Sequence, residues 1–200
     1  MVMVYRMPTK EKIERFWQWF DQNQTELFDM LKTEPQQANR KVNNRLKSLN
    51  RLVVAHLSMS ELDGKADFIL SADGIEAIFP IVEEIMRYAP NLEKWTFISF
   101  IPPQQVDLNQ LIIPPGVRVK DLKFKLTRID PKKYVLDVYV PELDQDKFYQ
   151  VLSRVFDIVR QMLGEYKTVK FIEKININPL DETQGLLPIS QLPAELGQNG

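Results

Sequence analysis

Two stretches of this chain show the same succession of patterns, and this recurrence restricts the possible folds more than any other feature. In each stretch, two apolar runs flank a turn dipeptide, a helical pattern follows, and a further apolar run ends at a proline. The first stretch is 51–103, with its turn at Asp63-Gly64, and the second is 121–180, with its turn at Asp130-Pro131. The sequence therefore predicts two ββαβ units that are related by pattern and not by residue identity.

The apolar runs give the expected positions of the strands, and helical spacing gives the helices between them. The strands are expected in "RLVVAHLSM", "KADFILS" and "KWTFISF" of the first unit and in "DLKFKLTRI", "YVLDVYV" and "TVKFIEKININ" of the second. One helix is expected at about 76–88, before Ala89-Pro90, and another from its N-cap Asp144 to Gly164 as its C-terminal stop. An α+β fold with largely antiparallel sheet follows, with helices over one face.

The remaining segments flank these units. Residues 1–50 are expected to form a helical arm, with Thr9 as N-cap of a first helix and a second helix from Pro35 to about Asn50. Four prolines between Pro102 and Pro115 mark 104–120 as a connector, and 181–200 reads as a proline-punctuated tail.

Composition narrows the classes of function. The net charge is -1, so no overall field favours nucleic acid or anionic lipid. The chain has no cysteine and one histidine, which excludes disulfides, thiolate zinc sites and a cysteine nucleophile. Seven glycines leave no Gly-rich phosphate loop, and no apolar run suits a signal peptide or a membrane span. We expect a cytoplasmic protein with no cofactor and no membrane contact.

The stretch "SADGIEAIFP" is the part of the chain that most resembles a catalytic site. One hypothesis makes Ser71 and Asp73 a nucleophile and acid that act with His56 in a hydrolase. The glycine pattern of a nucleophile elbow is absent around Ser71. The favoured hypothesis is structural: Asp73 and Glu76 form a capping box, or the main helix begins at Pro80. We therefore expect no catalytic residue and no enzyme activity.

Three features suggest binding surfaces. Trp19 lies off the apolar stripe of the first helix, so it either packs inside the fold or contacts another chain. Arg40 and Arg45 belong to a basic run without acids between Gln36 and Arg51, as expected of a phosphate-binding helix or of a solvated face. Lys123 and Lys125 alternate with Leu122, Phe124 and Leu126, so they lie on one polar sheet face, but no aromatic residue is interleaved with them on that face to stack on bases.

The chain resembles a family of uncharacterised bacterial proteins at "FWQWFDQN", "ILSADG", "IFPIVEEIMRYAPNLEKWTFISFIPP" and "NINPL". The resemblance implies a bacterial, cytoplasmic origin and transfers no activity. Together with the surface features, it leads us to expect a non-enzymatic interaction or regulatory module that binds another protein. The alternatives are a nucleic-acid-binding protein that uses the basic second helix, and a hydrolase that uses the Ser71/Asp73 turn. The oligomeric state stays open.

Overall fold

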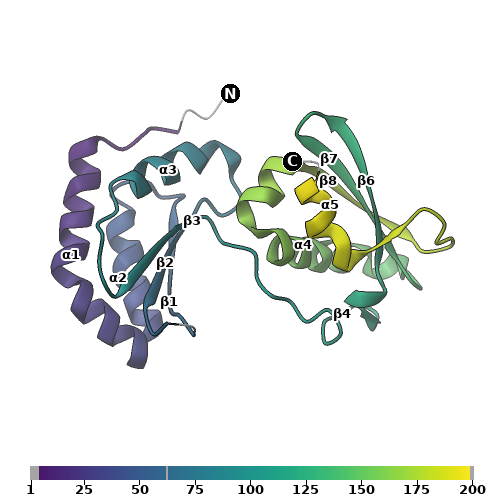
Figure 1. Cartoon of the computed structure of the whole chain (residues 1–200), viewed down its shortest axis with the longest axis horizontal. Coiled ribbons are helices and arrows are strands. Elements are labelled where there is room, and N and C mark those ends of the chain that lie inside the picture. The colour runs from purple at the N-terminus through teal and green to yellow at the C-terminus, as the bar shows by residue number, and fades with distance from the viewer. Residues whose placement is uncertain (1–4, 62, 199–200) are drawn as a thin grey trace. The chain divides into compact units, whose positions relative to one another are not determined.

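The structure, a computed structural model, describes residues 5–61 and 63–198. It is an α+β fold, as predicted, and the chain divides between Ile101 and Pro102 into two compact units (Figure 1). Among the described residues, no sheet contains strands from both units. Each unit is therefore considered by itself.

The first unit begins with two helices, α1 (Lys10–Thr33) and α2 (Pro35–Leu46). Thr9 is the N-cap of α1, and Pro35 occupies the first turn of α2, both as predicted. Proline suits this position because its missing N–H would have no helical partner there. The helix α2 ends four residues before the predicted Asn50, and turns follow it.

The three strands of the first unit form one mixed sheet in the order β1-β2-β3. They are β1 (Val54–Met59), β2 (Ala66–Ser71) and β3 (Trp95–Ser99). The hairpin pair β1 and β2 is antiparallel, whereas β3 runs parallel to β2 because the helix α3 (Phe79–Arg87) crosses over between them. The expectation of a largely antiparallel sheet therefore holds for the hairpin but not for β3.

Aromatic packing joins the first helices to this sheet. Trp17 and Phe20 of α1 lie with their ring centroids 5.3 and 5.2 Å from that of Phe68 in β2, and both also contact Phe97 in β3. The indole Nε1 of Trp17 donates a 2.8 Å hydrogen bond to the carbonyl oxygen of Ile85, which ties α3 to α1. The predicted helical arm is therefore not a separate segment, because it supplies one side of the core (Figure 1).

Two asparagines of α2 bind the outer edge of β1. The Asn43 carboxamide accepts from the N–H of Ala55 (2.9 Å) and donates to the carbonyl of Ala55 (2.8 Å). Asn39, one helical turn earlier, makes the same pair of bonds with Leu57 at 2.8 and 2.9 Å. The helix thus supplies the hydrogen bonds that a neighbouring strand would otherwise make, so this edge is closed.

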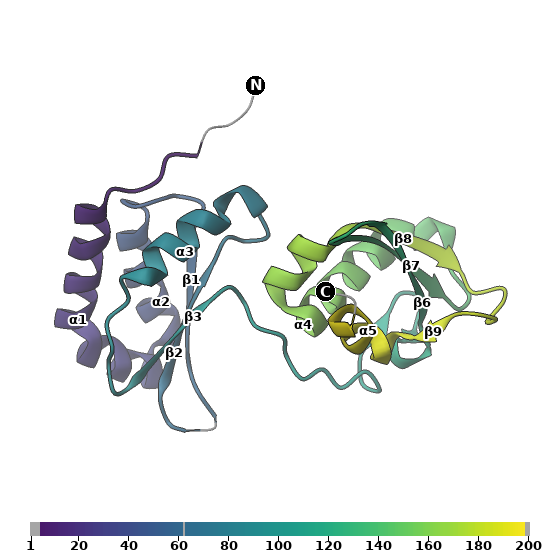
Figure 2. The same cartoon turned by 45° about the horizontal axis from the view of Figure 1, so that its top comes forward.

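The second unit contains the same four elements in the same order. They are β6 (Lys123–Asp130), β7 (Lys133–Val140), α4 (Phe148–Phe171) and β8 (Ile172–Pro179). The hairpin strands β6 and β7 are antiparallel, β8 runs parallel to β7, and the second strand is central, as in the first unit (Figure 2). Strand order and direction therefore agree between the two predicted ββαβ units.

The second unit contains more helix and strand than the sequence predicted. The helix that begins at Phe148 is interrupted at Gly164, as predicted, because Gly164 has a non-helical backbone with a φ of 76°. Helical turns resume after it and continue to Phe171, so β8 starts four residues after the expected Thr168. The connector contains a short hairpin, β4 (Ile112–Ile113) with β5 (Val117–Arg118). The tail contains β9 (Leu187–Pro188) and α5 (Leu192–Gln198), and its apolar side chains enter the core.

Candidate functional site

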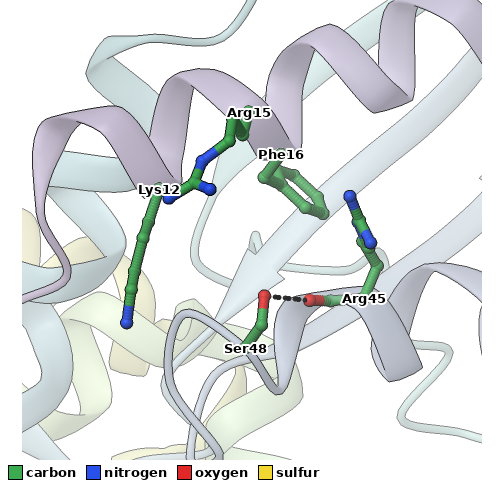
Figure 3. Close-up of a pocket in the computed structure, with 5 residues that line it drawn as sticks. All are labelled: Lys12, Arg15, Phe16, Arg45 and Ser48. Carbon is green, nitrogen blue, oxygen red and sulfur yellow. Dashed lines mark hydrogen bonds between the residues drawn. The ribbon is translucent and has the colours of Figure 1, made fainter.

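A basic groove of about 260 Å³ lies between α1 and the end of α2. Figure 3 shows Lys12, Arg15 and Phe16 on the side of α1, facing Arg45 and Ser48 across it. Phe16 is almost fully buried and belongs to the core. None of these lining residues is a carboxylate, so the groove has local positive charge although the whole chain has a net charge of -1.

The cations of the groove differ from other cations on the same helices. Lys10, Lys32 and Lys41 each form an ion pair with an acid of α1, at 3.6, 2.9 and 2.7 Å. In the described part of the chain, Lys12, Arg15 and Arg45 form no such pair. Arg15 donates through Nε to the carbonyl of Glu11, which leaves its terminal nitrogens available. Arg15 interacts electrostatically with the Glu11 carboxylate, but no carboxylate lines the groove, so positive charge gathers there.

Arg45 also stacks on Trp19. Its guanidinium carbon lies 5.7 Å from the centre of the indole ring, within the range of cation–π attraction. Trp19 is half-buried and contacts Phe16, with ring centroids 6.0 Å apart. The contact explains why α1 carries aromatic bulk off its main stripe: this face of the helix packs against α2, and Trp19 borders the groove there.

The other candidate residue of the second helix lies elsewhere. Arg40 is exposed, and its position on the helical wheel places it on the side of α2 away from α1. The structure thus separates Arg40 from Arg45, and it adds Lys12, Arg15 and Ser48 to the site. Sequence reasoning missed these residues because their grouping depends on how α1 packs against α2.

Lys123 and Lys125 lie on the open face of the second sheet, as predicted. Lys125 and Thr127 are exposed and Lys123 is half-buried. The residue between the lysines along β6, Phe124, is fully buried on the other face, but strand pairing places the half-buried Tyr139 of β7 directly opposite Lys123. On the same face, Asn176 donates a 2.9 Å hydrogen bond to Asp137, which pairs with Lys125 in the register. The argument that this face lacks an aromatic residue was therefore wrong.

The Ser71 turn has a structural explanation that differs from the predicted capping box. Asp73 is not an N-cap, because it has a φ of 49° and the short helix that follows (Glu76–Ile78) begins after Ile75. Ser71 is fully buried, and its hydroxyl accepts a 2.9 Å hydrogen bond from the N–H of Asp73. The alternative prediction of a main helix starting at Pro80 agrees with α3 to within one residue.

The structure does not bring the three proposed hydrolase residues together. His56 is exposed on β1 and pairs with Ile69, and within the described residues no hydrogen bond joins it to Ser71 or Asp73. Over the same residues, no group of three or more histidine or acidic side chains is placed to hold a metal ion. The helices that are described are all too short or too polar to cross a membrane.

Comparisons with protein-family models, with curated proteins and with solved structures found no match.

Proposed function

We propose that this protein is an interaction module whose α1–α2 groove binds an acidic segment of another protein. The observation that supports this proposal is the meeting of Lys12, Arg15 and Arg45 around one groove without an internal carboxylate. Unpaired guanidinium groups bind carboxylates through two parallel hydrogen bonds, which gives both energy and orientation.

The surroundings of the groove favour a protein partner over nucleic acid. Arginine and tryptophan are the residue types most enriched at protein interface hot spots, and here Arg45 rests on Trp19. The stacking restricts the guanidinium, so less side-chain entropy is lost when a carboxylate binds. A nucleic-acid site would be expected to continue along the phosphate backbone, whereas Arg40 points away from these cations.

The proposal can be tested by fluorescence anisotropy with two labelled probes, a short oligoglutamate peptide and an oligo-dT of similar charge. The full chain should bind the peptide, and Arg45→Ala should weaken that binding about 10- to 150-fold, since hydrogen bonds to charged groups contribute about 1.5–3 kcal/mol. Arg40→Ala is the matched control, because it removes the same charge from the same helix outside the groove. It should change the affinity less than twofold by the weak, screened effect of an exposed charge.

Two results would contradict the proposal. Equal losses in the Arg40 and Arg45 variants would mean that a diffuse basic face and not the groove binds the peptide. Tighter binding of oligo-dT, reduced by Tyr139→Ala or Lys125→Ala and unaffected by Arg45→Ala, would favour a nucleic-acid-binding function on the sheet of the second unit, where Tyr139 lies opposite Lys123.

A further inference from the structure

The two edges of the first sheet differ in how their backbone groups are used. On β1, Asn39 and Asn43 occupy the outward N–H and C=O groups of Leu57 and Ala55. On β3, the hydrogen bonds of the parallel ladder show which backbone N–H and C=O groups point toward β2 and which point outward. Ala66 donates to the carbonyl of Lys94, and Phe100 donates to the carbonyl of Leu70.

These two bonds define the alternation along β3. The even-numbered residues from Lys94 to Phe100 direct their N–H and C=O groups toward β2, so those of Trp95, Phe97 and Ser99 point outward. The N–H of Trp95 is used by the carbonyl of Leu92, at 3.2 Å. Within the described part of the chain, Phe97 and Ser99 have no strand beside them, so this edge can accept another strand.

Space for another strand lies along the same edge. A groove of about 520 Å³ runs between β3 and the C-terminal end of α3, where Met86, Ala89 and Pro90 form the opposite wall. Its volume is within the range of known ligand sites.

We infer that a second copy of this chain pairs through β3, antiparallel and with Phe97 opposite Phe97. In this register the two Phe97 residues exchange both of their hydrogen bonds across the two-fold axis. The N–H of each Ser99 then meets the carbonyl of Trp95 in the other copy, so the pairing satisfies the outward N–H groups of Phe97 and Ser99. Thr96 lies opposite Ile98 of the second copy, a β-branched pair of the kind that stabilises antiparallel strands.

The charge of the edge strands selects β3 for this self-pairing. When two identical sheet edges pair, the charged side chains of one edge strand meet those of the other. Charged residues and proline on an edge strand therefore usually prevent edge pairing. The edge strand β8 carries Glu173, Lys174 and Pro179. The part of β6 beyond its pairing with β9 carries Lys125 and Arg128. The sequence of β3, "WTFIS", has neither charge nor proline. Among the described open edges of the three-stranded and four-stranded sheets, β3 is therefore the one that can meet its own copy without repulsion.

The test is sedimentation equilibrium of the full chain and of two variants at Ser99. The wild type and Ser99→Ala, which keeps the backbone N–H, should both sediment at twice the monomer mass. Ser99→Pro removes the outward N–H without affecting the hydrogen bonds to β2. Proline is tolerated at such a position on an edge strand, where the N–H faces away from the sheet. Two interface hydrogen bonds are then lost in each dimer, so the dissociation constant should rise about 30-fold, equivalent to about 2 kcal/mol.

A monomeric wild type at all concentrations would overturn the inference, and so would a dimer whose affinity Ser99→Pro leaves unchanged. The tryptophan fluorescence of each variant shows whether it is folded. If Ser99→Pro does not fold, amide hydrogen exchange of the wild type decides the question. Protection of the Phe97 and Ser99 amides should increase with protein concentration, and protection independent of concentration would refute the pairing.

Discussion

The closure of the β1 edge by α2 gives the sharpest prediction about stability. Replacing Asn43 by alanine removes the carboxamide that binds both backbone groups of Ala55, a residue that is 1% exposed. An unsatisfied buried backbone group costs about 1–3 kcal/mol, and two such groups are left. Alanine is the better helix former, by about 0.7 kcal/mol at most, which offsets a small part of the loss. We expect the free energy of unfolding of the first unit to fall by about 1–5 kcal/mol.

The assay can follow the first unit alone. All three tryptophans, Trp17, Trp19 and Trp95, belong to it, so the fluorescence change in urea reports its unfolding and not that of the second unit. The matched control is Asn44→Ala, the same substitution one residue further along the helix. Asn44 is exposed, and its carboxamide oxygen accepts from Lys47 at 2.9 Å. Its replacement should change the stability by less than about 0.5 kcal/mol.

The reasoning fails if the two alanine variants unfold at the same urea concentration. A second variant tests which part of the interaction matters. Asn43→Asp keeps an acceptor for the N–H of Ala55 but places a second oxygen against its carbonyl, so it should be no more stable than Asn43→Ala near neutral pH. A stability equal to that of the wild type would show that the bond to the carbonyl contributes nothing.

Three further predictions follow from individual residues. Trp17→Phe should lower the stability of the first unit by about 0.5–1.5 kcal/mol more than Trp95→Phe, in urea unfolding followed by circular dichroism, because it removes the indole donor to the Ile85 carbonyl, which keeps the 3.3 Å bond from the Tyr88 N–H, while the buried Nε1 of Trp95 has no hydrogen-bond partner among the described residues; equal losses would contradict this. Gly164→Ala should destabilise the second unit by about 1–3 kcal/mol in calorimetry, because the backbone conformation of Gly164 disfavours any side chain. Gly197→Ala, at a glycine without a positive φ, should not destabilise it. A Gly164 variant as stable as the wild type would contradict the kinked backbone at this position. Burial, together with the nearby Asp63, raises the pKa of the Asp67 carboxyl. The contribution of this carboxyl to folding stability is therefore fully present below the ordinary aspartate pKa of about 4, and it is lost as the pH rises through the higher pKa of the folded state. Asp67→Asn should therefore raise the urea midpoint at pH 7 and not at low pH, and an equal effect at both would argue against the raised pKa.

The sequence alone determined the order and type of most elements. Apolar periodicity, the Asp63-Gly64 turn and Pro35 act through the local backbone, so they predict structure without knowledge of the rest of the chain. The expected β7 and α2 begin within one residue of their observed starts. One failure has a local cause: Asp73 has a positive φ angle, which the predicted capping box did not anticipate, whereas the positive φ of Gly164 is the one expected of a glycine that ends a helix.

Which residues meet was decided by the tertiary structure. Trp19 and Arg45 each looked like a candidate for a different partner, and the packing of α1 against α2 places them in one contact beside Lys12 and Arg15. Tyr139 reaches Lys123 only through the register of two strands. In the sequence, Asn39 and Asn43 look like polar residues on a solvated helix, and they gain their role because β1 lies beside them. Such neighbours are set by long-range packing, which depends on the whole core and leaves no periodic signal in the residues it joins.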